Sequence, residues 1–82
     1  MIARLSGLLA GVAADSAIID VNGVGYLVSA SGRTLGSWGA AGAAVIAHVE
    51  THVREDAIQL YAFATEDERD WFRILNGVQG VG

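Results

Sequence analysis

Three neighbouring side chains in the second half of the chain could act on a ligand through charge alone. Arg54, Glu55 and Asp56 lie between two segments in which apolar and polar residues alternate. Adjacent carboxylates exposed at a turn repel anions such as phosphate and need no covalent chemistry to do so. Charged turns also commonly serve to keep the ends of apolar strands soluble. On spacing alone, the solvating role is the simpler interpretation.

A second group could bind a metal ion. His48, Glu50 and His52 recur at every second position, so they would share one face of a strand. Imidazole and carboxylate groups are both zinc ligands. However, steps of two residues separate side chains by about 7 Å along a strand, and no further ligand is identifiable. We therefore favour an exposed polar face in an otherwise apolar strand, and we expect neither a metal nor another cofactor.

Several catalytic chemistries are excluded by residue type. The chain contains no cysteine and no lysine, which excludes a thiol nucleophile, a thiolate metal site and the phosphate-binding lysine of a P-loop. The run 23–25 has two glycines, but Val28 stands where a dinucleotide-binding fingerprint needs the third. Asp15, Ser16 and the histidines form no triad that the sequence supports. A non-catalytic protein is the expectation.

Length and composition predict one small domain. The 82 residues are 52% hydrophobic, which suffices for one modest core. No apolar run approaches the roughly 18 residues of a membrane span, and the first residues lack the features of a secretory signal, so we expect a cytoplasmic protein and no membrane partner. The net charge of −4 argues against nucleic-acid binding, although the acids cluster at Glu55, Asp56 and in 66–70.

Alternating hydrophobicity predicts five strands. Asn22 and Gly23 favour a tight hairpin between the second and third strands, because both tolerate positive φ. The glycine-containing segment 31–39 suits a short helix or a structured loop. Five strands with a non-strand insertion after the third predict a mainly β protein with an OB-fold barrel, and an SH3-like barrel or an open sheet remains an alternative. The expected strands are 1–9, 16–21, 25–30, 44–53 and 57–63.

The last two strands should form a hairpin with Arg54, Glu55 and Asp56 protruding at its tip. In each strand the residues alternate between two faces, so both strands can pack into a sheet while the charged residues protrude. In 44–53 the two faces are Val45, Ala47, Val49, Thr51, Val53 and Ile46, His48, Glu50, His52; in 57–63 they are Ile58, Leu60, Ala62 and Ala57, Gln59, Tyr61, Phe63.

A helix is expected to follow from Thr65. Its hydroxyl can cap the helix, and Glu68 three residues later completes a capping box. Trp71, Ile74, Leu75 and Val78 recur with helical spacing as one apolar stripe, which we expect to pack on the barrel or on a partner. Gly77 is the expected end of the helix.

The chain ends in Gly80, Val81 and Gly82, a poor ending for an independent domain, and we expect the sequence to be truncated there. Two glycines flanking an apolar residue suit a tight turn whose backbone N–H groups could face an anion at the start of a second helix. Together with the capped helix, this ending is similar to the first half of a helix-hairpin-helix, a module that grips a nucleic-acid backbone.

Four sequence blocks in order along the whole chain resemble the N-terminal part of the RuvA family of Holliday-junction-binding subunits. The blocks are 1–7, 23–26, 53–57 with Leu60, Tyr61 and Phe63, and 80–82. The resemblance implies an OB-fold domain over 1–64 and, over 65–82, the start of a second domain that carries two helix-hairpin-helix motifs. A mobile third domain of the family contacts the motor subunit RuvB.

The resemblance also implies a function in homologous recombination and DNA repair. Family members form homotetramers that hold a four-way junction open and deliver it to RuvB, where the ATPase resides; the RuvC resolvase is a further candidate partner. By resemblance, Glu55 and Asp56 form an acidic pin, and Arg54, Gly80, Val81 and Gly82 contact the DNA backbone. The alternative is an OB-like oligomerisation or protein-interaction module with little DNA binding of its own.

The positive charge needed to hold DNA is scarce in this sequence. Its five basic residues are all arginines, and we expect most of the positive surface of such a protein to lie beyond Gly82. The 82-residue chain alone should therefore bind junction DNA poorly. The arginines are Arg4, Arg33, Arg54, Arg69 and Arg73.

Overall fold

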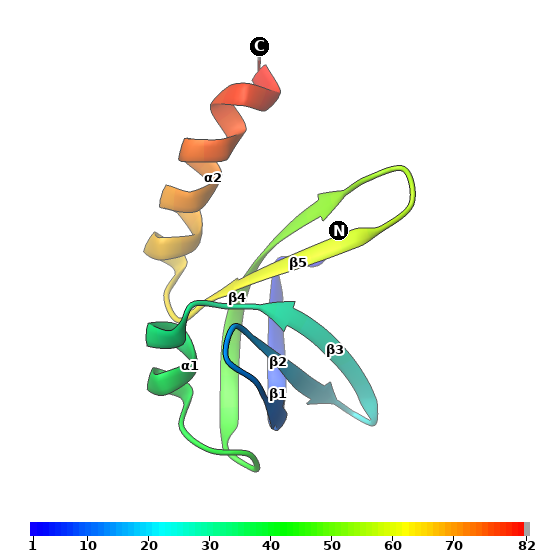
Figure 1. Cartoon of the computed structure of the whole chain (residues 1–82), viewed down its shortest axis with the longest axis vertical. Coiled ribbons are helices and arrows are strands. Elements are labelled where there is room, and N and C mark those ends of the chain that lie inside the picture. Colours follow the sequence, from blue (N-terminus) through cyan, green and yellow to red (C-terminus); the bar gives the residue numbers. More distant parts are fainter. Residues whose placement is uncertain (82) are drawn as a thin grey trace.

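Five strands close into a barrel, and two helices lie outside it (Figure 1). The computed structural model describes the backbone of residues 1–81 and the side chains of residues 1–76. The elements in chain order are β1 (Arg4–Val12), β2 (Ser16–Val21), β3 (Val24–Ser29), α1 (Gly32–Trp38), β4 (Ala44–Val53), β5 (Ile58–Phe63) and α2 (Glu66–Val81).

The strand order confirms the predicted OB-fold. The strands follow one another around the barrel as β1-β2-β3-β5-β4, and β4 pairs back with β1. The barrel closes where β3 and β5 run parallel at Ser29 and Tyr61, and there the Gln59 amide donates a hydrogen bond of 2.7 Å to the Ser29 hydroxyl. This closure, with a helix between the third and fourth strands, fits the five-stranded OB architecture and excludes an open sheet.

The barrel interior is filled by the inward-facing residues of all five strands. Leu9, Ile19, Val28 and Val49 are the largest apolar side chains that are almost fully buried, and α1 adds Leu35 to the same core. The predicted short helix is thus confirmed as α1, whose first turn is capped by the Ser31 hydroxyl, which accepts from the Thr34 N–H at 3.1 Å.

Strand β1 is shared by two neighbours. It pairs with β4 through residues 4–8 and with β2 from Leu8 onward, with a register shift between Leu9 and Gly11. The expected strand over 1–9 was wrong at both ends: β1 starts at Arg4, and it continues to Val12 because the residues after the bulge still pair with β2. At Gly7 the two strands approach so closely that a Cβ would overlap the carbonyl oxygen of Asp20.

The Asn22–Gly23 hairpin is confirmed. Both residues have positive φ, 53° and 90°, which suits a two-residue turn between twisted strands. The Asp20 carboxylate accepts a hydrogen bond of 2.8 Å from the Gly23 N–H and so stabilises the turn. The third strand, Val24–Ser29, begins and ends one residue earlier than expected, and the fifth, Ile58–Phe63, begins one residue later.

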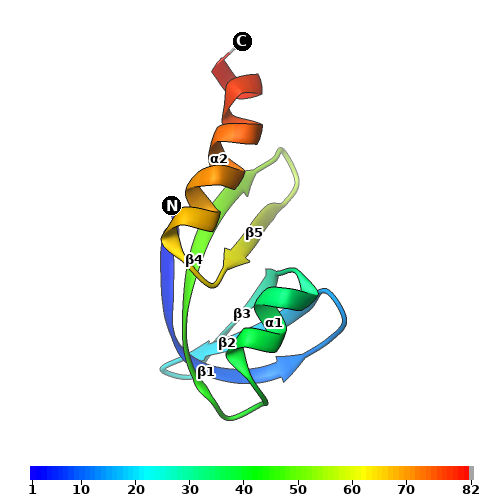
Figure 2. The ribbon, with the colours of Figure 1, turned by 90° about the vertical axis from the view of Figure 1, so that its left-hand side faces the viewer.

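The β4–β5 hairpin and α2 extend from the barrel on the same side (Figures 1 and 2). β4 pairs with β1 only as far as His48, whereas it pairs with β5 along the whole stretch from His48 to Val53. The outer end of the hairpin is therefore a two-stranded ribbon. The packing of α2 is strongest against these same two strands.

Candidate nucleic-acid interface

The outer end of the β4–β5 hairpin stands clear of the core. Val53 and Ile58 pair directly across the last rung of the ribbon, on the strand faces that line the core lower down. Here they are 71% and 67% exposed, because no barrel lies beneath them. The predicted protrusion is confirmed.

Glu55 and Asp56 are the two central residues of the loop 54–57 that joins β4 to β5. The Arg54 N–H donates to the carbonyl of Ala57 at 2.8 Å and closes the turn. Both carboxylates and the Arg54 side chain are exposed. Among the described residues, none of the three takes part in an ion pair or a side-chain hydrogen bond. These charges are therefore hydrated and available to an external ligand.

The outward face of the hairpin is covered by α2 through an aromatic cluster of four rings: His52, Tyr61, Phe63 and Phe72. Phe72 lies 5.0 Å from Tyr61, 5.0 Å from Phe63 and 5.7 Å from His52, measured between ring centroids. His52 also meets Tyr61 edge-on at 5.0 Å. Each such pair contributes about 0.5–1.5 kcal/mol beyond the burial of its surface. One helix residue thus contacts both strands of the hairpin.

Charged side chains flank Phe72 on the same helix face. The Arg73 Nε lies 3.0 Å from the Glu50 carboxylate of β4, which is 17% exposed. Arg69, 13% exposed, donates to the carbonyl of Ala3 at 3.4 Å and pairs with Asp70 at 3.0 Å. The docked face of α2 therefore carries two arginines, one bonded to the carbonyl of Ala3 and one to Glu50, with Phe72 between them.

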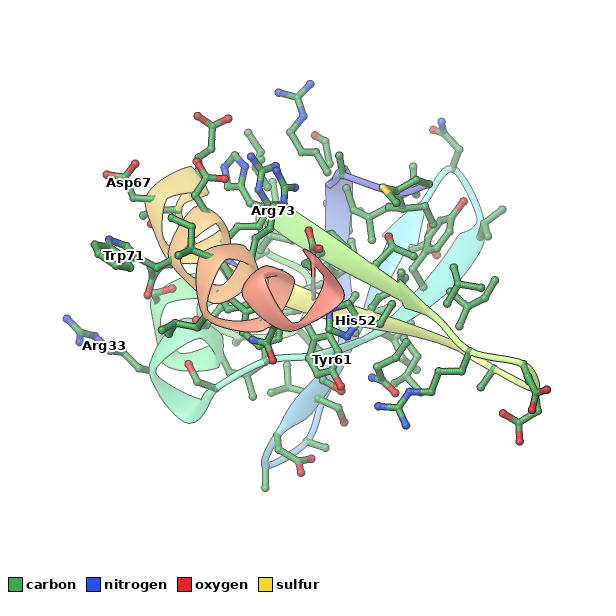
Figure 3. All side chains as sticks on the ribbon, turned by 90° about the horizontal axis from the view of Figure 1, so that it is seen from above. Arg33, His52, Tyr61, Asp67, Trp71 and Arg73 are labelled. Atoms are coloured by element: carbon green, nitrogen blue, oxygen red, sulfur yellow. The ribbon has the colours of Figure 1, made fainter. Side chains whose placement is uncertain are left out.

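The apolar stripe predicted to pack on the barrel does not do so. Trp71, Ile74 and Leu75 are 64%, 54% and 66% exposed. At about 100° per residue, Trp71 and Ile74 lie roughly 150° around the helix from the mean direction of the docked residues Arg69, Phe72 and Arg73, and Leu75 lies roughly 115° from it. Figure 3 shows Trp71 pointing away from the molecule on one side of α2, with His52 and Tyr61 on the other side. Of the two options, packing on the barrel was wrong for these residues, and packing on a partner stays a prediction; the side chain of Val78 lies outside the described residues.

The start of α2 is as expected, but its end is not. The Thr65 hydroxyl accepts from the Glu68 N–H at 3.2 Å, which confirms Thr65 as the cap. The capping box is only half formed among the described residues, because the Glu68 carboxylate accepts from the Thr65 hydroxyl at 3.2 Å and not from the Thr65 backbone N–H. The helix continues past Gly77 to Val81, because glycine disfavours a helix interior by only about 1 kcal/mol and does not force an end. Gly80 and Val81 fall in its last turn, Gly82 lies outside the described residues, and the phosphate-binding role of all three stays a prediction.

Two members of the HxExH group have structural partners. Glu50 pairs with Arg73, and His52 belongs to the aromatic cluster. No group of three or more His, Asp or Glu side chains in the described part of the chain could hold a metal ion. The exposed polar face that we favoured was wrong in one respect: all three residues are only partly exposed, and α2 covers Glu50 and His52.

Positive charge is sparse around the hairpin. Two of the five arginines, Arg69 and Arg73, are paired with carboxylates on α2 or β4. Arg4, Arg33 and Arg54 have exposed side chains that form no ion pair with any described residue.

Neither helix is long and apolar enough to cross a membrane within the described residues.

Sequence reasoning missed the role of Phe72 and the Arg73–Glu50 pair. A signal was present: the face of the hairpin turned away from the core carries His52, Tyr61 and Phe63. Three aromatic side chains on the outward face of two adjacent strands indicate that another element covers them. Hydrophobicity did not identify the helix face that covers them, because that face carries Arg69 and Arg73.

The barrel, its projecting hairpin and the appended helix define an OB-fold domain of the kind whose loops often bind nucleic acids. The family model described as the RuvA N-terminal domain matches residues 1–62. The chain belongs to this family. Over its 82 residues it is 57% identical to proteins of Brucella canis and Brucella suis and 55% identical to one of Brucella anthropi, each named Holliday junction branch migration complex subunit RuvA. The chain spans 40% of the length of these relatives.

Proposed function

We propose that this chain is the N-terminal part of a subunit that binds four-way DNA junctions and holds them open for branch migration in recombination and repair. Family membership and the names of the relatives support this function over that of a general interaction module. The structural observation that carries the proposal is the pair of hydrated, unpaired carboxylates of Glu55 and Asp56 at the end of a projecting hairpin.

The two carboxylates act by repulsion. A carboxylate roughly 5 to 7 Å from a phosphate repels it by about 1 to 3 kcal/mol at an effective dielectric between 20 and 40. A continuous duplex laid across the tip would place phosphates there, whereas the strands of an open junction diverge at its centre. The tip therefore disfavours ordinary duplex more than it disfavours a junction, and this difference is the source of specificity.

The attraction comes from other groups. Arg54, exposed beside the carboxylates, is suited to contact a phosphate of a diverging strand. In this proposal, Gly80, Val81 and Gly82 supply a further contact with the DNA backbone. Most of the attraction belongs to parts of the complete protein that the relatives have beyond the length matched here.

The complete protein works as a non-catalytic, cytoplasmic homotetramer in this proposal. Four copies bring four acidic tips to the centre of the junction and multiply the penalty on continuous duplex. The ATP-driven motor is a separate subunit, RuvB, and the RuvC resolvase is a further partner. The 82 residues contain no lysine and hence no P-loop of their own.

The test is to neutralise the tip in the complete gene product with Glu55→Gln and Asp56→Asn. We expect affinity for plain duplex to rise and the preference for a four-way junction to fall by about tenfold or more. The matched control is Glu66→Gln with Asp67→Asn, which removes the same charge from exposed residues at the start of α2. If the tip and control variants change duplex binding equally, only net charge matters and the proposed role of the tip is wrong.

The alternative, an OB-like oligomerisation module, is favoured by one observation: the exposed apolar side chains of Trp71 and Ile74. Under this alternative, neutralising the tip would change neither duplex binding nor junction preference.

A further inference from the structure

The acidic tip has little support of its own. β4 leaves β1 at His48, and β5 meets β3 only at Tyr61, so the rungs beyond them belong to a ribbon of two strands. An isolated two-stranded ribbon is marginally stable in water. A flexible ribbon would let Glu55 and Asp56 move away from the phosphates that they are proposed to repel.

Contacts other than its own rungs hold the ribbon. Near its base, the Val49 N–H donates to the carbonyl of Ala3 at 2.9 Å, and the Gln59 amide donates to the Ser29 hydroxyl at 2.7 Å. On the inward face, the Thr51 hydroxyl donates to the carbonyl of Ile2 at 2.6 Å and accepts from its N–H at 3.2 Å. On the outward face, Phe72 of α2 packs on His52 of β4 and on Tyr61 and Phe63 of β5. His52 is one residue before the last rung, so the aromatic cluster reaches almost to the loop.

We propose that Phe72 is a positioning residue for the acidic tip, with α2 acting as a splint along the β4–β5 hairpin. Because its ring contacts both strands at once, it restricts their twisting as well as their bending. The Arg73–Glu50 pair at 3.0 Å holds the adjacent helix position against β4. The direction in which Glu55 and Asp56 point is thus set by a helix residue that contacts neither of them.

This inference deepens the proposed function and rests on it in one respect: the consequence for DNA. The splint itself is a property of the free chain. The two parts are therefore tested by separate measurements, so that failure of one can be told from failure of the other.

The first measurement is amide hydrogen exchange of the 82-residue chain in two variants, Phe72→Ala and Trp71→Ala. Each removes one aromatic ring from adjacent positions of α2, but Trp71 faces away from the hairpin (Figure 3). Exchange of the Arg54 amide, which is bonded to Ala57 at the tip, reports on the end of the ribbon. We expect it to accelerate about tenfold in Phe72→Ala and less than about twofold in Trp71→Ala.

Amides of Ile19 and Val28 in the barrel core provide the internal reference. Acceleration at the tip with unchanged exchange in the core supports the splint. Equal acceleration at both places, or none at the tip, overturns it. Should Phe72→Ala fail to fold, Phe72→Leu keeps an apolar contact without the ring, and the same comparison between tip and core decides.

The second measurement is the ratio of junction to duplex affinity in the complete gene product. We expect Phe72→Ala to lower the ratio about two- to tenfold although no charge changes, and Phe72→Tyr to restore it because the ring is retained. An unchanged ratio in Phe72→Ala, in a protein whose ratio does fall on neutralising Glu55 and Asp56, would overturn the positioning role and leave the proposed function standing. Wild-type protein without junction preference would instead overturn the proposed function, and the exchange measurement would still decide the splint.

Discussion

The Phe72 ring on α2 lies over the His52 imidazole of β4, with centroids 5.7 Å apart and ring planes 29° apart. This contact joins the helix to the projecting hairpin just before its last rung. It makes the hairpin and the first turns of α2 one packed unit, although they are separate elements in the sequence. The loop with Glu55 and Asp56 therefore lies at the end of a hairpin that α2 supports.

Removing the Phe72 ring should destabilise the chain far more than removing the ring next to it. We expect Phe72→Ala to lower the free energy of unfolding by about 1–3 kcal/mol, because a half-buried ring loses three aromatic contacts, and Trp71→Ala to lower it by less than about 0.5 kcal/mol. Urea unfolding followed by far-UV circular dichroism measures both. Equal losses would show that the helix docks by a different face.

The ion pair between Arg73 and Glu50 should contribute modestly and in a salt-dependent way. Arg73→Gln should lower the free energy of unfolding by about 0.5–1 kcal/mol at low ionic strength, since the arginine is half exposed. The loss should shrink in about 1 M salt, where the charges are screened. Arg33→Gln is the control, because Arg33 forms no ion pair with a described residue. A loss that is independent of salt would contradict an electrostatic contribution.

The crossing of β1 and β2 at Gly7 should admit no side chain. Gly7→Ala places a Cβ against the carbonyl of Asp20 and should cost about 2 kcal/mol or more, since backbone atoms must move. Gly36→Ala in α1 meets nothing within 4 Å and should stabilise the chain by about 0.5–1 kcal/mol. Thermal unfolding of the two variants compares them directly. A tolerated Gly7→Ala would mean that the strands separate more easily than their packing indicates.

The 82-residue chain alone should bind junction DNA weakly. Its net charge is −4, and two of its arginines are already paired with carboxylates. We expect a dissociation constant no tighter than about 10 μM at low salt, in the range of non-specific binding. Fluorescence anisotropy with a labelled four-way junction measures it. Nanomolar binding by this chain would contradict the expectation that the attraction lies elsewhere in the complete protein.

The barrel could be predicted because its signals are local. Alternation in 44–53 and 57–63 separated the two faces of β4 and β5, and the Asn22–Gly23 pair predicted a hairpin. Each depends on the conformational preference or burial of a few consecutive residues. The strand β1 was less predictable, because its second half continues after a bulge through Gly11, which carries no side chain to mark a face.

The docking of α2 could not be predicted from hydrophobic periodicity. The strongest apolar stripe, with Trp71 and Ile74, faces outward, while the docked face contains Arg69 and Arg73. Long charged side chains pack through their stems and satisfy their charges at the rim, so a scale of hydrophobicity scores them as exposed. The exposure of Glu55 and Asp56 could be predicted from the strands on either side of them. Their effect on DNA could not, because it depends on where the DNA phosphates lie, which the sequence of this chain does not determine.

Repulsion of DNA by the tip is tested most directly by a graded series of tip charges in the complete gene product. The wild type carries two negative charges at Glu55 and Asp56. The double substitution Glu55→Gln with Asp56→Asn removes both, and Glu55→Lys with Asp56→Lys reverses them. Affinities for a four-way junction and for a duplex of the same length are measured at one salt concentration.

Duplex affinity should rise steadily as the tip goes from two negative charges to none to two positive charges, and the preference for the junction should fall at each step. Repulsion has this signature because its sign follows the charge. A fall in junction affinity on neutralisation, with duplex affinity unchanged, would contradict repulsion, because it would mean that the carboxylates of Glu55 and Asp56 make attractive contacts with the junction.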